Sequence, residues 1–104
     1  NLNWILFEGF EGTVLGLEKD DLRIDVFPNP TNNFIKVISN YIPKNIINYK
    51  LVDLNGKILY ERSKFYRSNI LEEIHINSFR PGLIFLVITE ADQLLEIKKI
   101  IINN

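Results

Sequence analysis

The chain has 104 residues, enough for one domain with a modest hydrophobic core. Its formal net charge is -1 and its Lys and Arg residues are scattered, which excludes the basic footprint of a nucleic-acid-binding domain and predicts no attraction to acidic lipid. The absence of cysteine excludes a disulfide scaffold, a thiol nucleophile and a Cys-based metal site.

Residues 1–21 differ from the rest of the chain. They hold three of the five glycines and five acidic residues around two short apolar pieces, "WILF" and "TVLGL". We interpret them as a linker or as an extra strand at a sheet edge, and residues 22–104 as the folded domain. The glutamates and the lack of a basic start argue against a signal peptide, so an exported parent protein is expected to begin upstream. No apolar run approaches the roughly 20 residues that span a bilayer.

From residue 22 onward, β-branched and aromatic residues form short runs separated by turn signals, and Ala91 is the only alanine. This composition disfavours helix and favours strands. The spacing of the runs predicts an all-β antiparallel sandwich of about seven strands. The strands are expected at about residues 23–27, 34–39, 46–53, 57–62, 70–76, 83–90 and 94–102.

The first two predicted strands are separated by "FPNPTNN" at residues 27–33. Pro28 and Pro30 have no backbone N–H, so neither fits a central strand. Each proline also favours extended geometry in the residue before it. We therefore interpret the segment as a rigid sandwich corner at which the chain leaves for the other sheet, in preference to a binding loop.

The remaining connections also have local signals. Asn55-Gly56 is a strong hairpin signal and predicts a type I′ turn with Gly56 at positive φ. In "FRPG", Pro81 fixes φ and Gly82 accepts a positive φ. "EADQ" at 90–93 predicts a polar turn, and "NYIPKN" at 40–45 a longer loop.

Few residues are candidates for catalysis. His75 is the only histidine, so no His pair can hold a metal, and its alternation with Ile74 and Ile76 predicts a solvent-facing or half-buried side chain. Glu72 and Glu73 are neighbours on a strand and point to opposite faces, so they cannot act as an acid/base pair. No serine lies in a nucleophile-elbow sequence; the serines considered are Ser39, Ser63, Ser68 and Ser78.

Two weaker binding signals remain. Asp20, Asp21 and Asp25 offer oxygen ligands for calcium, but their spacing matches no loop motif and favours a solvated acidic linker. Aromatic residues along the chain are better explained as core and rim than as a sugar-stacking platform; they are Phe27, Phe34, Tyr41, Tyr49, Tyr60, Phe65, Tyr66, Phe79 and Phe85. No metal or cofactor is expected.

The last predicted strand, "LLEIKKIIINN", has no polar face. One face carries Leu95, Ile97, Lys99 and Ile101, and the other carries Glu96, Lys98, Ile100 and Ile102. Strand ends near a chain terminus are usually polar. Either both faces of this strand are covered, or its end binds a partner.

Four segments in this order resemble the type A C-terminal sorting domain of type IX secretion cargo: "VFPNPTNNFIKV", "YKLVDLNGKILYE", "INSFRPGLIFLVI" and "EIKKIIIN". The resemblance covers about residues 22–104. The positions that match the family motifs are Pro28, Asn29, Pro30, Thr31, Asp53, Gly56, Lys57, Gly82, Lys98, Lys99, Ile100 and Ile101. Ile84, Gln93 and the terminal Asn103-Asn104 depart from the family pattern.

The resemblance implies an immunoglobulin-like sandwich that is a sorting signal and not an enzyme. It implies transit through the periplasm of a Gram-negative cell, recognition by the outer-membrane type IX machinery, and removal by a surface sortase. The cargo is then released or attached to a lipopolysaccharide anchor at the cell surface. The domain is expected to be a monomer, and its apolar last strand is expected to contact the machinery by strand addition.

Other classes of function remain open from the sequence. An adhesive or carbohydrate-binding accessory module is the main alternative, and a row of exposed aromatic residues on one sheet would favour it. A structural spacer would be favoured by a polar last strand. A stand-alone enzyme is disfavoured, because no acid, base, nucleophile and oxyanion-stabilising group come together in the sequence.

Overall fold

The computed structural model describes residues 21–103 and is almost entirely β-structure. The strands are β1 (Ile24–Phe27), β2 (Phe34–Ser39), β3 (Ile47–Val52), β4 (Ile58–Lys64), β5 (Leu71–His75), β6 (Gly82–Glu90) and β7 (Gln93–Ile102). The predicted strands agree with these bounds to within about two residues. The agreement follows from the short apolar runs and the turn residues that separate them.

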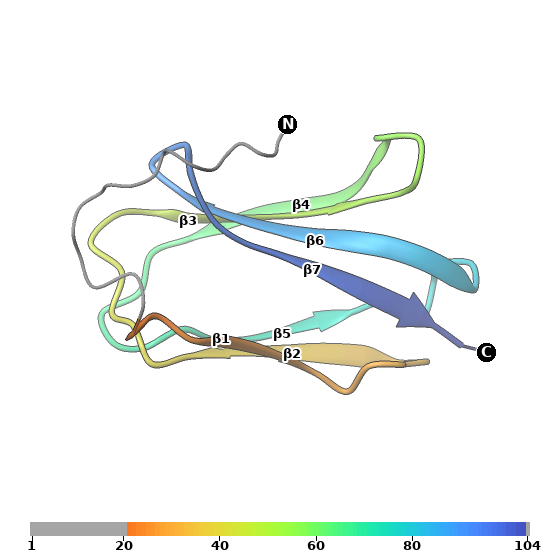
Figure 1. The fold of residues 1–104 in the computed structure, drawn as a ribbon, viewed down its shortest axis with the longest axis horizontal. Helices are drawn as coiled ribbons and strands as arrows, with labels where there is room; N and C mark the ends of the chain where they lie inside the picture. The colour runs from red at the N-terminus through yellow and green to blue at the C-terminus, as the bar shows by residue number, and fades with distance from the viewer. Residues whose placement is uncertain (1–20, 104) are drawn as a thin grey trace.

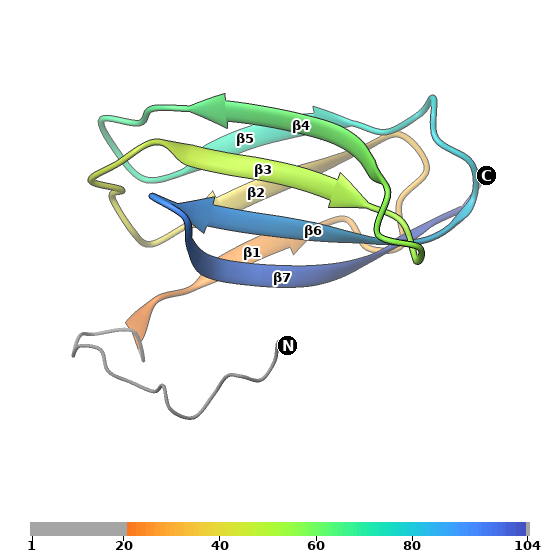
Figure 2. The same ribbon diagram turned by 90° about the horizontal axis from the view of Figure 1, so that it is seen from above.

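The strands form two antiparallel sheets that pack face to face (Figure 1). One sheet has the order β1-β2-β5 and the other has the order β4-β3-β6-β7. Seen from above, β1 and β7 lie along one side of the sandwich and β4 and β5 along the other (Figure 2). The predicted all-β antiparallel sandwich is confirmed.

The core between the sheets is made by alternate residues of each strand. Ile35 and Val37 of β2 and Leu86 and Ile88 of β6 belong to this core, and all four side chains are fully buried. Ile74 and Ile76 are likewise buried, whereas His75 between them is exposed, as the alternation predicts.

The predicted route of the chain at the corner is wrong. β1 and β2 are neighbours in the same sheet, with Asp25 opposite Ile38, so the chain does not change sheets there. Residues 28–33 reverse its direction instead, and the Phe27–Pro28 and Asn29–Pro30 peptide bonds are both cis. The chain changes sheets in three other connections, at residues 40–46, 65–70 and 76–81.

The predicted type I′ turn is also misplaced. Gly56 has a φ of 84°, as expected, but Asn55 is not among the residues with positive φ. Asp53 shapes this loop instead, because its Oδ1 accepts hydrogen bonds from the N–H groups of Asn55 and Lys57, both at 2.9 Å. Two consecutive residues with positive φ occur in the polar turn at 91–92, between β6 and β7.

Other predictions for the connections are confirmed. Gly82 has a φ of 141°, and residues 40–46 form the expected longer loop. Within the described part of the chain, no helix is long and apolar enough to cross a membrane. The predicted linker or edge strand lies outside the described residues, except for Asp21.

Candidate functional site

The corner at residues 28–31 is bound to the last strand of the opposite sheet. Asn29 Nδ2 donates to the carbonyl of Lys99 at 2.7 Å, and its Oδ1 accepts from the N–H of Ile101 at 2.9 Å. Thr31 donates its N–H to the carbonyl of Ile101 at 2.9 Å and accepts from the N–H of Asn103 at 2.7 Å. The corner therefore takes the place of a neighbouring strand along the final residues of β7.

The corner residues differ in burial. Pro28, Asn29 and Pro30 are exposed, whereas Thr31 is buried and its Oγ1 donates to the carbonyl of Phe34 at 2.6 Å. The sequence motif thus contains the residues that bind β7, but nothing in the sequence identifies β7 as their partner.

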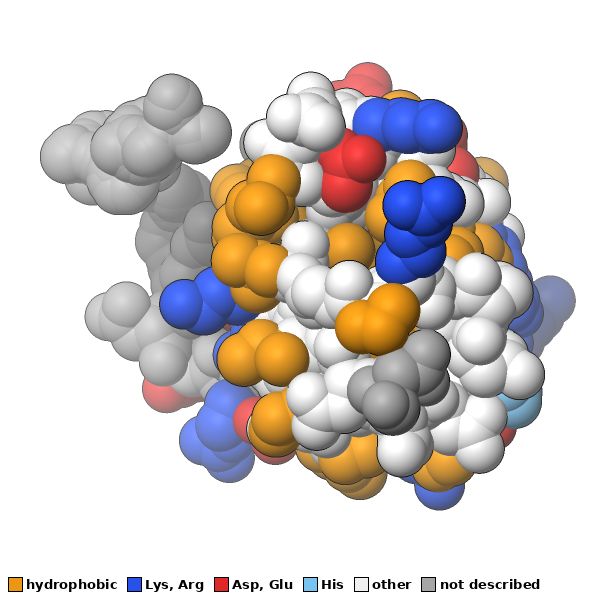
Figure 3. Space-filling view, turned by 90° about the vertical axis from the view of Figure 1, so that its right-hand side faces the viewer, with side chains coloured by type: hydrophobic (Ala, Val, Ile, Leu, Met, Phe, Trp, Pro, Cys, Tyr) orange, Lys and Arg blue, Asp and Glu red, His pale blue; other side chains and the backbone are white. Residues whose placement is uncertain are grey.

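The hairpin motif and Gly82 lie at the same end of the sandwich as the corner. Val52, just before the hairpin, is opposite Phe85, and Gly82 is opposite Ile102. A shallow groove of about 630 Å³ separates the hairpin from the start of β6, and it is lined mainly by residues 53–59 and 78–84. Figure 3 looks onto this end, where hydrophobic side chains gather along one side of the view.

The alternation along β7 divides the terminal motif between two environments. Ile100 and Ile102 are buried in the core, so only one face of the strand is covered by the described residues, and the alternative of two covered faces is wrong. Ile97 and Ile101 point outward and are 43% and 42% exposed. The two motif isoleucines, Ile100 and Ile101, therefore have different surroundings.

The two motif lysines, Lys98 and Lys99, also lie on opposite faces of β7. Lys98 is opposite the fully buried Leu86, so it leans toward the inside of the sandwich, and its Nζ lies 4.0 Å from Glu96 Oε2. Burial raises the pKa of Glu96 above its ordinary value, an effect that Lys98 partly opposes. Lys99 is opposite the outward-facing Phe85 and is exposed. Among residues 21–103 it forms no ion pair.

The outward side of the four-stranded sheet is mainly apolar toward the end that holds the corner, whereas Asn48, Ser63 and Thr89 form a polar row toward the other end. Paired residues of antiparallel strands share one face, so the register gives its rows: Leu83 with Ile101, Ile58 with Val52 and Phe85, and Val87 with Ile97. We call this surface the apolar outer face. It consists of Val52, Ile58, Leu83, Phe85, Val87, Leu94, Ile97 and Ile101.

The outward side of the three-stranded sheet is mixed. Lys36 is opposite both Phe27 and Glu73, and Asp25 is opposite Ile38. Charged and apolar residues alternate there, as on an ordinary solvated sheet. The contrast singles out the four-stranded sheet as the unusual surface.

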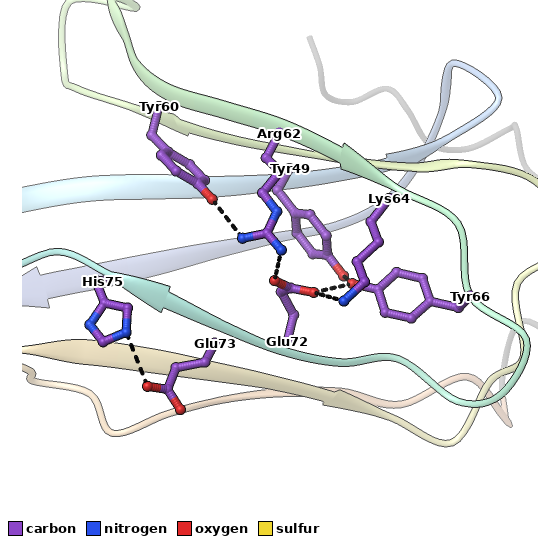
Figure 4. Close-up of polar contacts among 8 residues, drawn as sticks. All are labelled: Tyr49, Tyr60, Arg62, Lys64, Tyr66, Glu72, Glu73 and His75. Atoms are coloured by element: carbon purple, nitrogen blue, oxygen red, sulfur yellow. Dashed lines mark hydrogen bonds and ion pairs between the residues drawn. The ribbon is translucent and has the colours of Figure 1, made fainter.

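A buried polar cluster joins the sheets on the side of β4 and β5 (Figure 4). Glu72 is 5% exposed and accepts a hydrogen bond from the Tyr66 hydroxyl at 2.7 Å. Its carboxylate lies 2.8 Å from Arg62 Nη2 and 3.3 Å from Lys64 Nζ. Tyr66 also shares a 2.6 Å hydrogen bond with Tyr49. All its members have partners, so the cluster acts as an inter-sheet clamp.

Burial raises the pKa of both tyrosines in this cluster. The pKa of Tyr49 rises to about 12, and that of Tyr66 rises further because Tyr49 and Glu72 also bind its hydroxyl. Glu72 and Glu73 lie on opposite faces, as predicted, but the burial of Glu72 was not predicted. The available signal was that Glu72 shares its face with the buried Ile74.

A second buried carboxylate fixes the loop at 40–46. Glu90 accepts hydrogen bonds from the Tyr41 hydroxyl at 2.5 Å and from the N–H groups of Lys44 and Asn45 at 2.7 and 2.8 Å. Burial and Glu90 together raise the pKa of Tyr41 to about 12. These contacts anchor a connection between the sheets.

The residues considered for catalysis or metal binding do not gather into a metal site in the described part of the chain. His75 Nε2 lies 3.2 Å from Glu73 Oε2, and both side chains are exposed. Within residues 21–103, no three His, Asp or Glu side chains come together in a possible metal site. Asp20, one of the calcium candidates, lies outside the described residues.

Comparison with known proteins gives one family. The model of a family described as a secretion system C-terminal sorting domain matches residues 25–103. No curated protein matches the chain. The matched range includes all seven described strands except Ile24, the first residue of β1.

Proposed function

We propose that this chain, which belongs to the family of secretion system C-terminal sorting domains, directs a cargo protein across the outer membrane through the type IX machinery and is then removed by a surface sortase. The observation that carries the proposal is the family match over residues 25–103. It implies secretion to the cell surface or the extracellular space, with transit through the periplasm as part of the proposal.

The recognition motif divides into residues that build the fold and residues that face solvent. Asn29 and Thr31 bind β7, Asp53 and Gly56 form the hairpin loop, and Ile100 fills the core. We assign these a supporting role in recognition. The outward-facing motif residues Lys99 and Ile101 are the better candidates for direct contact with the machinery.

Strand addition is restricted by the corner. Its hydrogen bonds occupy the outward backbone groups of Ile101 and the carbonyl of Lys99. A partner strand therefore has access only to the earlier part of β7, about residues 93–98. This favours side-chain contacts over a long backbone ladder as the basis of recognition.

The sortase is proposed to cut upstream of the sandwich. The glycines and acidic residues before the corner predict an exposed cleavage site within about residues 8–24, of which residues 8–20 lie outside the described part. Asn40 donates to the carbonyl of Asp21 and accepts from the N–H of Arg23, and Leu22 packs on the core. These contacts hold residues 21–23 against the domain, so cleavage is expected before Asp21.

The adhesive or carbohydrate-binding alternative gains no support in the described residues. The exposed aromatic side chains there are Phe27 and Phe65. Phe27 lies on β1 and Phe65 directly follows β4, so they come from different sheets. They do not form the row on one sheet that sugar stacking would need.

The test is export of a reporter. The 104-residue chain is fused to the C-terminus of a periplasmic reporter in a type IX-competent cell, and reporter is quantified in periplasm, on the surface and in the medium. We expect surface or medium localisation and loss of the domain from the exported reporter. The reporter alone and a strain without the type IX machinery are controls. Reporter that remains periplasmic and intact in competent cells would refute the proposal.

A further inference from the structure

The apolar outer face is the surface that folding explains least. An antiparallel sheet with one solvated side normally has polar residues on that side. Here four of the eight side chains are exposed, namely Ile58, Leu94, Ile97 and Ile101, and the other four are half-buried. Contiguous apolar patches of this kind mark interaction surfaces.

The charged residues on the same side are mainly basic. Lys99 is opposite Phe85 on β6, and Lys50 is opposite Val87 one row away. Glu61 is the nearby acidic residue, opposite Lys50, and its carboxylate already accepts a hydrogen bond from Asn48 at 3.1 Å. Lys99 has no acidic partner among residues 21–103.

We infer that the apolar outer face docks a protein of the export machinery, whose contacting surface is apolar and places an acidic side chain against Lys99. This inference rests on the proposed function and identifies the surface through which it operates. Complementary charge at an otherwise apolar contact provides specificity more than affinity.

A second copy of the chain fits this surface less well. Two apolar outer faces in contact would bring together Lys50 and Lys99 of each copy, with one carboxylate per copy, that of Glu61, to balance the two lysines. Like charges buried together in an interface oppose association.

A lipid surface also fits less well. The backbone groups of Ile101 and Lys99 that point away from β6 are hydrogen-bonded to the corner. By the alternation of an antiparallel ladder, the N–H and C=O of Ile97 also point away from β6, at a place that the corner does not cover. Backbone groups at such an edge would be left without partners in hydrocarbon, whereas a protein can satisfy them.

The two adjacent lysines provide a matched test. In the reporter fusion, Lys99→Glu is expected to reduce the exported fraction about tenfold or more, because it sets like charges against each other in the contact. Lys99→Ala is expected to reduce it less. Lys98→Ala, which removes a lysine that leans toward Glu96 inside the sandwich, is expected to export normally.

A second pair of variants tests the apolar side chains. Ile97→Asn removes an exposed apolar residue from the apolar outer face and is expected to reduce export. Leu71→Asn removes a more exposed one, at 66%, from the outward side of the other sheet and is expected to export normally. Melting temperatures of the purified variants identify any loss that arises from unfolding.

Photocrosslinking identifies the occupant. Benzoyl-phenylalanine is introduced at Val87, within the apolar outer face, and at Leu71 as the control, in the complete fusion during export. We expect an adduct with a machinery protein from Val87 only, absent in cells without that machinery and lost with Lys99→Glu. An adduct of twice the fusion mass, or an adduct with lipid alone, would overturn the inference.

The outcomes separate this inference from the function on which it rests. If the wild-type fusion stays in the periplasm, the proposed function fails. If the wild-type fusion is exported, and Lys99→Glu and Ile97→Asn are exported equally well while remaining folded, the docking surface is wrong and the function stands.

Discussion

Asn29→Ala should loosen the last strand from the corner. Asn29 makes two hydrogen bonds to β7, donating to the carbonyl of Lys99 at 2.7 Å and accepting from the N–H of Ile101 at 2.9 Å. A net hydrogen bond contributes about 0.5–1.5 kcal/mol to stability. Because Asn29 is exposed, water replaces part of both bonds, and we expect a loss of about 1–2 kcal/mol in the free energy of unfolding.

The neighbouring Asn32 is the matched control. It is exposed in the same connection, and it makes no side-chain hydrogen bond among the described residues. Asn32→Ala should therefore change stability by less than about 0.5 kcal/mol. Asn29→Asp keeps the acceptor for Ile101 but sets a carboxylate oxygen against the Lys99 carbonyl in place of the donor, so it should be at least as destabilised as Asn29→Ala.

Urea unfolding of the three variants measures these differences at constant m. A loss of 1 kcal/mol also lowers the melting temperature of a domain of this size by about 4–8 °C. Amide hydrogen exchange at Ile101 gives a local measure, because its N–H loses its acceptor in Asn29→Ala. If Asn29→Ala has the same midpoint as Asn32→Ala and the Ile101 amide stays protected, the corner does not hold β7 as we describe.

Three further predictions concern the rest of the fold. Gly56→Val should cost about 1–3 kcal/mol through backbone strain at φ 84°, since no atom lies within 4 Å of an added Cβ; an unchanged melting temperature would contradict this. Glu72→Gln should cost about 1–3 kcal/mol by weakening the hydrogen bond from Tyr66 and the ion pairs, while the exposed Glu73→Gln stays within about 0.5 kcal/mol; equal urea midpoints would exclude the inter-sheet clamp. The raised pKa of Glu96 means that the native state holds its proton more tightly than the unfolded state, so stability falls as pH rises through that pKa. Glu96→Gln should flatten the dependence of stability on pH in urea unfolding measured from pH 4 to pH 7. If the variant and the wild type show the same dependence on pH, Glu96 is not its source.

The strands and the core were predictable because both depend on local pattern. Period-two alternation places Ile74 and Ile76 inside and His75 outside without knowledge of the partner strands. Gly82 could be predicted to have positive φ because proline and glycine leave few alternatives for the turn.

The contacts between distant strands were not predictable in the same way. The Asn55-Gly56 dipeptide suggested a type I′ turn, but the Asp53 side chain binds two N–H groups of the loop and selects another geometry. The prolines showed that β1 ends but not where the chain then goes. The apolar outer face needed the strand order, because its members come from β3, β4, β6 and β7 and only register brings them together.

Because β7 is the last of the described strands in the chain, the domain can fold completely only after all of these strands have been translated. β7 is the last of the described strands to leave the ribosome, and it brings Ile100 and Ile102 to the core and supplies the groups that the corner binds. A polypeptide that stops before Ile100 lacks two core side chains and most of the groups that the corner binds, so we expect its sandwich to be destabilised. Under the proposed sorting function, cargo whose translation stops before this strand lacks a complete signal, and we expect such cargo not to be exported.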